Sequence, residues 1–299
     1  MMMRAFVVVN PAAGGGRTER LWRSIRDRLS RLGLDFEFGE TTGRGVATQM
    51  VRQAVAGRWP LVVVVGGDGT VNEAINGLLD VTGSPPGSLA VIGTGRGRDA
   101  ARNLGLAPDP ETAARRIVEG EDVLVDLGVA EWGEGRSRYF INAAGAGFDA
   151  VVAKRAQAGG GSGTVPYLLA VLRALRAHRS VPASIHLDDR PLWSGPMTAA
   201  VVANGAYYGG GMKIAPDADP ADGCLDLVVL GNLGRLELLR WLPTVYRGAH
   251  LANPKVSTWR GRTILIATVT PVPVHVDGEA VAETPVRMSV CPQALRLRR

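Results

Sequence analysis

The stretch of sequence that decides the fold is VVVVGGDGTVNE, residues 62–73. Four valines in a row that run into glycines indicate a strand buried on both faces, as in a parallel sheet. After the glycines, apolar residues recur at helical spacing, at Val71, Ala74, Ile75, Leu78 and Leu79. The stretch therefore predicts a strand, a glycine turn and a helix in succession.

This glycine turn has the chemistry of a phosphate site. The first N–H groups of a helix have no partner inside the helix, and they lie at the positive end of its dipole. Gly66, Gly67 and Gly69 remove side chains that would keep an anion away from the backbone. Asp68 would repel a phosphate unless a divalent cation lay between them, so we expect it to act on Mg²⁺, directly or through water. The alternative is a tight turn without a ligand, because a single glycine motif is a weak signal.

Composition favours a globular protein with an anionic partner. The 299 residues are 46% hydrophobic and 21% charged, and their net charge is +6. This length predicts two domains, and the basic excess suggests nucleotide, nucleic acid or an anionic membrane surface as partner. Cys224 and Cys291 are isolated, which indicates neither a disulfide framework nor a zinc site and fits the cytosol.

No targeting or membrane-spanning segment is predicted. The apolar run from Ala5 to Val9 turns polar at Asn10 and is too short for a signal peptide. No stretch approaches the roughly 18–20 apolar residues that a membrane span needs. We therefore expect a cytoplasmic protein that meets lipid, where it does, from the aqueous side.

The first 130 residues alternate between strand and helix patterns. The expected elements are strands at Ala5–Val9, Asp35–Phe38, Val62–Val65 and Leu89–Ile92, and helices at Thr18–Leu32, Val46–Ala56 and from Val71 onward. This order predicts a doubly wound, mostly parallel sheet that binds ligands beyond the carboxyl ends of its strands.

Two further glycine turns fall on the same predicted sheet edge. Residues 10–16 contain three consecutive glycines, and residues 93–102 place Asp99 after another strand and its glycines. Neither a GxxxxGK[ST] loop nor a GxGxxG fingerprint fits any of the three turns, so the two common nucleotide-binding motifs are excluded.

From Tyr139 the texture changes to short β segments separated by turns, which is typical of an antiparallel sandwich or barrel. These segments are Tyr139–Ala143, Ala183–Leu187, Thr198–Ala203, Leu225–Leu230, Thr263–Thr268, Val272–Val276 and Val286–Val290. We predict one domain over residues 1–130 and a second over 131–291, with residues 292–299 as a tail that can return to the first.

Two helical patterns interrupt the second half, at Pro166–Arg179 and Leu236–Tyr246. Both combine leucines with arginines, and the second carries Trp241. Basic amphipathic helices of this kind lie in membrane interfaces. Packing of the leucines against the β domain is the alternative.

Three motifs follow one another along the chain: Gly66–Glu73, Gly93-Thr94-Gly95 with Asp99 and Arg102, and Val276-Asp277-Gly278-Glu279. In this order they resemble the bacterial lipid kinases of the diacylglycerol kinase catalytic-domain family, relatives of the YegS-type and sphingosine kinases. The resemblance extends from Asn10 to Arg296. NAD kinases share the first motif, so the resemblance depends on Asn72-Glu73 and on the late Asp-Gly-Glu.

The resemblance implies a nucleotide-binding α/β domain, a C-terminal β-sandwich with helical insertions that presents the lipid, and ATP with Mg²⁺ in the cleft between them. The family's nucleotide contacts fall on Thr41, Gly66, Gly67, Asp68, Gly69, Thr70, Val71, Asn72 and Thr94. Its magnesium ligands fall on Asp68, Asp99, Asp126 and Glu279. Its general base falls on Asp277. Its structural cation site falls on Asp217 with the backbone carbonyls of Ile214 and Asp219.

One position departs from the family pattern. This chain has Gly97-Arg98-Asp99 where the family commonly has Gly-Asn-Asp. An arginine there can pair with a phosphate or with Asp99, and either would alter the metal site.

Phosphoryl transfer needs positioning, charge neutralisation and a proton acceptor. The glycine turns and Mg²⁺ supply the first two, and Asp277 would accept the proton of the acceptor hydroxyl. Glu279 would point to the metal if the segment were extended. The alternative is a β-turn between strands 272–276 and 286–290.

We therefore expect an ATP- and Mg²⁺-dependent kinase of a membrane lipid hydroxyl, with diacylglycerol as the expected acceptor and peripheral contact with the membrane. Nucleic acid is not expected as a partner, and a homodimer is left open. One alternative is a kinase of a soluble acceptor such as NAD, which does not require the leucine- and tryptophan-rich helices. The other is a non-catalytic basic protein that binds an anionic membrane or polyanion.

Overall fold

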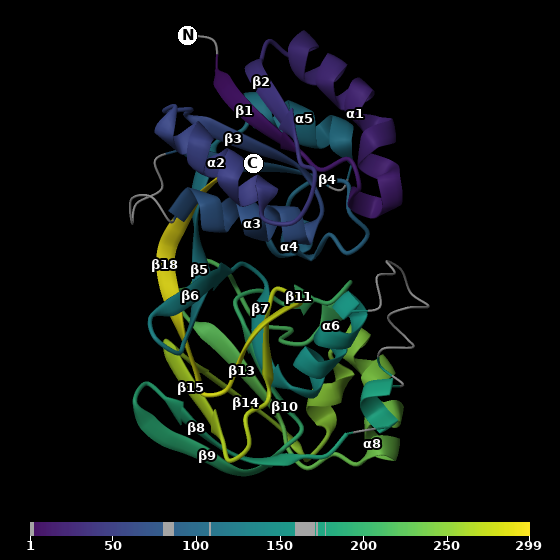
Figure 1. The fold of residues 1–299 in the computed structure, drawn as a ribbon, viewed down its shortest axis with the longest axis vertical. Coiled ribbons are helices and arrows are strands. Elements are labelled where there is room, and N and C mark those ends of the chain that lie inside the picture. The colour runs from purple at the N-terminus through teal and green to yellow at the C-terminus, as the bar shows by residue number, and fades with distance from the viewer. Residues whose placement is uncertain (1–2, 80–86, 108, 159–170, 172, 177) are drawn as a thin grey trace. The chain divides into compact units, whose positions relative to one another are not determined.

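The computed structural model describes residues 3–79, 87–107, 109–158, 171, 173–176 and 178–299 (Figure 1). The chain forms two compact units: unit 1 contains Met1–Leu127 with Pro292–Arg299, and unit 2 contains Gly128–Cys291. The observed boundary between the units falls after Leu127, whereas the sequence analysis places it after residue 130. The chain crosses between units twice, in β5 and in β18.

Unit 1 is built on a mostly parallel sheet. Its strand order is β2 (Asp35–Glu40), β1 (Arg4–Val9), β3 (Leu61–Gly66), β4 (Ser88–Gly93) and the end of β18 (Val286–Arg298). β1 pairs in parallel with β2 and β3, and β3 pairs in parallel with β4. Leu297 of β18 pairs in parallel with Leu89, so residues 292–299 belong to unit 1.

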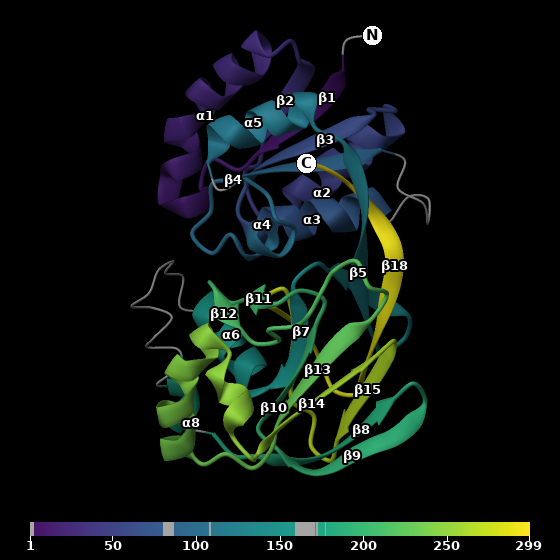
Figure 2. The same ribbon diagram turned by 180° about the vertical axis from the view of Figure 1, so that it is seen from behind.

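Helices cover both faces of this sheet. α1 (Ala13–Arg31) and α5 (Pro110–Glu119) lie on one face, with Trp22, Ile25 and Leu29 of α1 in the core (Figure 2). α2 (Val46–Ala56) and α3 (Asp68–Leu79) lie on the other face (Figure 1). All six residues of β3 are buried, as expected for a strand covered on both sides. The predicted doubly wound α/β fold is confirmed.

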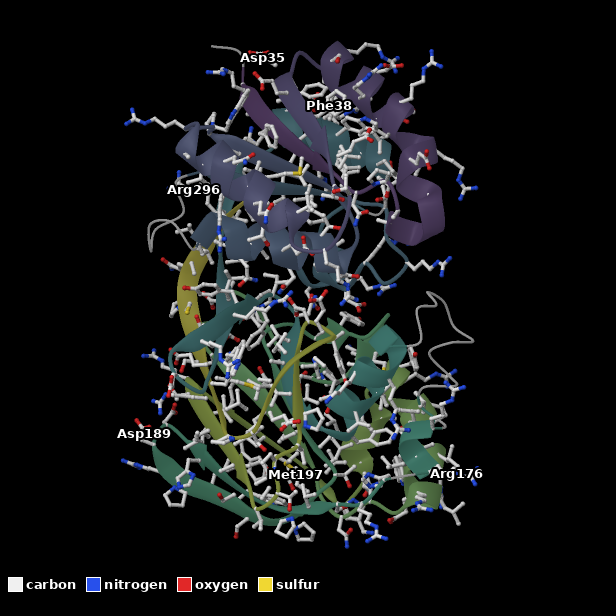
Figure 3. All side chains as sticks on the ribbon, in the orientation of Figure 1. Asp35, Phe38, Arg176, Asp189, Met197 and Arg296 are labelled. Carbon is white, nitrogen blue, oxygen red and sulfur yellow. The ribbon has the colours of Figure 1, made fainter. Side chains whose placement is uncertain are left out.

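Unit 2 is an antiparallel sandwich, as predicted. One sheet has the order β14 (Val256–Gly261), β13 (Leu225–Leu230), β10 (Ala199–Ala203), β7 (Ala143–Gly147), β16 (Pro273–Val276) and β17 (Glu279–Glu283). The other contains the first part of β18, then β15 (Thr263–Thr268), β8 (Val181–Leu187) and β9 (Arg190–Met197), with β5 (Asp122–Trp132) paired to β6 (Arg136–Phe140). Side chains from both sheets form one core, to which the fully buried Met197 belongs (Figure 3).

The helical segments of unit 2 differ from prediction in part. α6 (Phe148–Ala158) was not predicted, whereas the predicted helix Leu236–Tyr246 is found as α8 (Arg235–Trp241) and the 3₁₀ helix η1 (Leu242–Arg247). A second 3₁₀ helix, η2 (Ala249–Ala252), follows. Half of the predicted helix Pro166–Arg179 lies outside the described residues, and residues 171 and 173–176 are helical. Within the described part of the chain, no helix is long and apolar enough to cross a membrane.

Two helices of unit 1 begin inside glycine turns rather than after them. α3 begins at Asp68, three residues before the predicted start, so Asp68 lies in its first turn. α1 begins at Ala13, but Gly14, Gly15 and Gly16 have φ angles of 66°, 72° and 81°. Only glycine adopts this left-handed backbone without strain, so regular helix starts after Gly16.

The second and third turns meet where the strands of unit 1 end. Gly66 of β3 pairs with Gly93 of β4, so the turns that follow these two strands lie next to each other. A Cβ atom added to Gly95 would lie 2.6 Å from the Cα atom of Gly67. The backbone of Gly67 therefore leaves no room for a side chain at position 95, so this position needs glycine.

We predict that Gly95→Ala destabilises the protein by about 1–3 kcal/mol, because the added methyl group meets backbone that cannot rotate away. Gly43→Ala is the matched control, since a Cβ atom at Gly43 meets nothing within 4 Å. Urea unfolding followed by tryptophan fluorescence measures both variants. Equal midpoints for the two variants would contradict the close contact.

Candidate functional site

Side-chain hydrogen bonds join the three glycine turns of unit 1. Asn10 Nδ2 of the first turn donates to Thr70 Oγ1 at 2.8 Å. Thr18 Oγ1 of α1 lies 2.6 Å from Thr94 Oγ1 of the third turn, and Thr94 N donates to the carbonyl of Gly66. Residues 10–18, 66–70 and 93–99 thus form one hydrogen-bonded edge, here called the glycine edge. The sequence predicted that these turns share one edge.

The first turn of α3 is an accessible part of this edge. The carbonyl of Gly67 accepts the first helical hydrogen bond, from Val71 N, so the N–H groups of the next residues form the helix N-terminus. Gly67 and Asp68 are half-buried and Gly69 is exposed. An anion that approaches the helix therefore meets these three residues first.

Five predicted nucleotide contacts are buried, namely Gly66 at the end of β3 and four residues with side chains. Thr70, Val71, Asn72 and Thr94 expose 5%, 2%, 1% and 0% of their surface. Their side chains pack α3 and join the turns, so they support the glycine edge from inside. Thr41, also predicted as a contact, is half-buried, and its N–H donates to the carbonyl of Val9 at 2.8 Å.

Asp68 joins the second turn to the third. Its Oδ1 atom accepts a hydrogen bond from Ala100 N at 2.9 Å, in the first turn of α4 (Asp99–Asn103). Asp68 also lines a small pocket with Gly67, Gly93 and Arg98. The carboxylate is therefore oriented by α4 and lies where the accessible helix N-terminus begins.

The other two predicted metal carboxylates of unit 1 are deeply buried. Asp99 is 4% exposed and pairs with Arg102 Nη1 at 2.7 Å. Asp126 is 1% exposed, and its Oδ1 atom accepts a hydrogen bond from Gln293 N at 2.7 Å. Asp126 thereby holds the C-terminal segment against unit 1. The bond is made at Gln293, whose φ angle is 52°.

Arg98, the departure from the family pattern, begins α4 with a left-handed backbone, at a φ of 53°. Asparagine is among the few residues other than glycine that adopt this conformation easily, which gives a physical reason for the family's asparagine. Arg98 lines the same small pocket as Asp68, so it adds positive charge beside the helix N-terminus.

Glu73 has a role that sequence reasoning missed. Its carboxylate accepts hydrogen bonds from Gly45 N at 2.8 Å and Ala47 N at 3.2 Å. These N–H groups belong to the start of α2, so Glu73 of α3 caps the neighbouring helix. The signal was present, because Gly45 precedes α2 and no side chain of its own can cap that helix.

In unit 2, Asp277 and Gly278 form the two-residue turn of the hairpin between β16 and β17. Their φ angles are 46° and 81°, and Val276 pairs with Glu279. This geometry is typical of a type I′ hairpin turn. The Asp-Gly-Glu segment is therefore not extended, so the condition under which Glu279 would point to the metal is not met. The alternative of a β-turn is observed, but the strand that follows it is β17 (Glu279–Glu283), which was missed, and not 286–290.

The Asp277 carboxylate is held by three backbone N–H groups. Its Oδ1 atom accepts from Asn142 N at 2.9 Å and Ala143 N at 3.1 Å, and its Oδ2 atom accepts from Ile141 N at 3.0 Å. Hydrogen bonds of this kind favour the ionised carboxylate. These bonds join the Asp-Gly-Glu turn to the backbone of residues 141–143.

Glu279 forms an ion pair with Arg138. Arg138 Nη2 lies 2.8 Å from Glu279 Oε2, and both side chains are about three-quarters buried, at 21% and 26% exposed. Arg138 comes from β6, so the ion pair joins the β5–β6 hairpin to the Asp-Gly-Glu turn.

A buried histidine, His275, is hydrogen-bonded to this turn. His275 is 1% exposed and its ring stacks on Tyr208, with 5.7 Å between ring centroids. Gly278 N donates to His275 Nδ1 at 3.3 Å, so Nε2 carries the proton and donates it to Asp149 Oδ2 at 2.8 Å. The sequence analysis did not single out Asp149, because nothing near it in the sequence predicts this contact.

Asp149 also lies in the wall of an apolar cavity in unit 2. The lining is mostly apolar, and includes Phe148, Val152, Val201, Leu238, Leu242 and Val245. Among the described residues that line it, Asp149 is the one charged side chain. The cavity and the Asp-Gly-Glu turn are therefore linked through the Asp149–His275 hydrogen bond.

At the predicted structural cation site, the carboxylates of Asp217 and Asp226 repel each other. Burial and the charge of Asp217 raise the pKa of Asp226 from 3.8 to about 6. Asp226 was not predicted as part of this site. The Ile214 carbonyl accepts a hydrogen bond from His250 Nε2 at 3.0 Å, and burial lowers the pKa of His250, which favours the neutral ring that donates it. Asp219 is exposed and its carboxylate accepts from Ala221 N.

The predicted site residues fall into two groups. Asp68, Asp99 and Asp126 belong to unit 1, whereas Asp277 and Glu279 belong to unit 2. Over the residues that the structure describes, no three Asp, Glu, His or Cys side chains gather closely enough to hold a metal ion by themselves. Any metal in unit 1 therefore needs oxygen ligands beyond the protein's carboxylates, such as phosphate and water.

Known proteins resemble both units. Residues 4–130 match the diacylglycerol kinase catalytic domain, and residues 142–299 match the YegS C-terminal NAD kinase beta sandwich-like domain. A diacylglycerol kinase of Mycobacterium tuberculosis is 33% identical over 296 residues, covering 98% of this chain and 94% of that protein. A diacylglycerol kinase of Staphylococcus carnosus is 28% identical, covering 95% of this chain and 91% of that protein.

Solved structures share the fold. A diacylglycerol kinase from Bacillus anthracis has a TM-score of 0.75 at 23% identity, covering 99% of this chain and 96% of that one. An NAD kinase from Archaeoglobus fulgidus has a TM-score of 0.60 at 15% identity, covering 99% of this chain and 94% of that one. From the matches to both domains and the extent of the relatives' identity, the chain belongs to the lipid kinase family that joins a diacylglycerol kinase catalytic domain to a YegS-type C-terminal domain.

Proposed function

We propose that this lipid kinase transfers the γ-phosphoryl group of ATP, with Mg²⁺, to the free hydroxyl of diacylglycerol in a membrane. The choice of a lipid rests on one observation, the apolar cavity of unit 2, where Asp149 is the one charged residue among the described residues of the lining. Diacylglycerol has long apolar chains and a small polar end, and this cavity offers both environments. Its curated relatives named diacylglycerol kinase support the same acceptor.

The glycine edge supplies the proposed nucleotide site. The helix N-terminus at Gly67, Asp68 and Gly69 is accessible to phosphate, and Arg98 adds a positive charge in the adjoining pocket. The carboxylate oxygens fit Mg²⁺, which is commonly held by one or two carboxylates together with substrate phosphates and water. Asp68 would hold the ion, with the buried Asp99 and Asp126 as the other carboxylates of unit 1 proposed for it. When bound, Mg²⁺ neutralises the charge that develops on the phosphates.

Asp277 is the proposed proton acceptor. Three backbone N–H groups hold its carboxylate in one orientation, and hydrogen bonds of this kind favour the ionised form. A general base must already be oriented when the hydroxyl arrives, and a fixed carboxylate meets this requirement. Asp277 would take the hydroxyl proton as the oxygen attacks the γ-phosphorus.

NAD phosphorylation is the second candidate, because an NAD kinase shares the fold at a TM-score of 0.60. NAD carries two phosphates and polar sugars, which the apolar lining of the cavity does not match. Labelled ATP with Mg²⁺ tests both acceptors, with diacylglycerol in phosphatidylglycerol vesicles on one side and NAD on the other. We expect label in the lipid fraction. Label in NAD alone, or in neither acceptor, would refute the proposal.

We predict that Asp277→Asn lowers kcat by about 10²–10⁴-fold, because the amide cannot accept the proton. The change also places an NH₂ group near three N–H donors, so a modest loss of stability is expected. Thermal unfolding and the KM for ATP measured beside kcat separate these effects. Turnover at the wild-type rate in a folded variant would show that Asp277 anchors residues 141–143 without acting as the base.

We also propose a structural divalent cation between Asp217 and Asp226, with the carbonyls of Ile214 and Asp219. The support is the repulsion between the two carboxylates, which a cation would relieve. Mg²⁺ or Ca²⁺ should raise the thermal unfolding midpoint of the wild type. The same ions should raise the midpoint of the Asp217→Asn variant by a smaller amount. Equal shifts would exclude this site.

A pH dependence of stability follows from Asp226 in metal-free buffer. Its pKa is 3.8 unfolded and about 6 folded, so between these values the folded state binds more protons. The free energy of unfolding should therefore fall as pH rises from about 4 to about 6, and this contribution should stay level above that. Asp226→Asn should lack the fall. Urea unfolding at several pH values measures it, and parallel curves for the two proteins would contradict the assignment.

A further inference from the structure

The outer face of α8 and η1 carries an apolar stripe. Leu236, Leu239 and Tyr246 are 82%, 46% and 50% exposed, and Pro243 between them is exposed as well. The spacing of three and four residues places them on one side of the helical segment. Large apolar side chains on a helix that face water mark an interaction site more often than isolated exposed ones do.

Positive charge borders this stripe. Arg235, Arg240 and Arg247 are exposed, and no carboxylate within the described residues forms an ion pair with them. Glu237 is the one acidic residue between positions 231 and 250, and Lys255 neutralises it at 2.7 Å. Val171, Ala174 and Leu175 belong to the same apolar cluster as Leu238 of α8. The neighbouring Arg173 and Arg176 are exposed and add positive charge, and Arg176 is labelled in Figure 3. Leucines and a tyrosine among unpaired arginines match the chemistry of an anionic lipid surface.

The inner face of the same segment lines the apolar cavity. Leu238, Leu242 and Val245 alternate in sequence with the exposed residues and form part of the cavity wall. The segment thus separates the cavity from the exposed stripe by a single layer of helix. A surface held against the stripe would lie beside the proposed lipid-binding cavity.

We propose that the stripe Leu236, Leu239, Pro243 and Tyr246, with its bordering arginines, docks the protein onto an anionic membrane surface. The leucines and Tyr246 enter the boundary between headgroups and acyl chains, and the arginines contact lipid phosphates. The docking surface deepens the proposed function, on which it rests for the nature of the lipid that enters the cavity.

The test measures binding without turnover. The full-length protein is sedimented with vesicles of phosphatidylcholine containing 30% phosphatidylglycerol as probe, without ATP, beside vesicles of phosphatidylcholine alone. Leu236→Ser with Leu239→Ser should weaken binding to the anionic vesicles roughly tenfold or more. Arg240→Gln with Arg247→Gln should weaken it by about fivefold per arginine, and high salt should remove that difference.

Matched variants control for hydrophobicity and charge. Val269→Ser removes an equally exposed apolar side chain of unit 2, at 80%, and should leave binding unchanged. Arg190→Gln with Arg262→Gln removes two exposed charges of unit 2 outside α8 and η1, one at the start of β9 and one between β14 and β15, and should have a much smaller effect than the α8 pair. Circular dichroism confirms that each variant folds.

Three outcomes would overturn the docking surface. The first is equal weakening by the α8 variants and their controls. The second is wild-type vesicle binding by the double leucine variant. The third is a change of oligomeric state in that variant without loss of vesicle binding, which would make the stripe a contact between two copies of the chain.

Activity on a short-chain diacylglycerol, dissolved as monomers, separates the docking surface from the proposed function. The double leucine variant should phosphorylate this substrate at the wild-type rate, since it changes no residue that lines the cavity. If the wild type binds anionic vesicles through α8 but phosphorylates no diacylglycerol, the proposed function fails and the docking surface stands.

Discussion

The close approach of two backbones constrains unit 1. The turns after β3 and β4 touch at Gly67 and Gly95, where a methyl group would lie 2.6 Å from the neighbouring Cα atom. Because these turns touch, Asp68 reaches the first turn of α4, and Thr94 reaches both the Gly66 carbonyl and Thr18. A site made of backbone N–H groups keeps its shape only if its turns cannot move apart, and tight packing against backbone provides that rigidity.

The carboxylates assigned to chemistry also bind distant backbone. Asp68 accepts from Ala100, Asp126 from Gln293 and Asp277 from residues 141–143. Each bond satisfies a backbone donor and fixes the carboxylate in one orientation. Substitution at any of these positions therefore changes structure and chemistry together. For this reason kcat, KM and the unfolding midpoint have to be measured on the same variant.

The sequence predicted the fold class, the shared edge of the glycine turns and most strands, because the valine runs and glycines carry local signals. It missed β17, which alternates weakly in the segment Glu279–Glu283, and α6, which follows Gly147 in the sequence and not one of the Ser, Thr, Asp or Asn residues that mark most helix starts. It also missed the partners of Asp277, Glu279 and Asp149. These partners are contributed by segments more than 100 residues away, and no local pattern specifies such pairs.

The helix Leu236–Tyr246 illustrates why the sequence left two interpretations open. Leucines at 236, 238, 239 and 242 predict both packing and membrane contact, and the structure divides them between two faces. Leu238 and Leu242 line the cavity, so packing explains them, whereas Leu236 faces water with four-fifths of its surface exposed. Packing within unit 2 therefore does not explain Leu236, because its side chain is barely buried there. An exposed apolar stripe of this kind is explained if another surface covers it while the enzyme works. For the proposed docking surface, that other surface is the membrane that holds the lipid substrate.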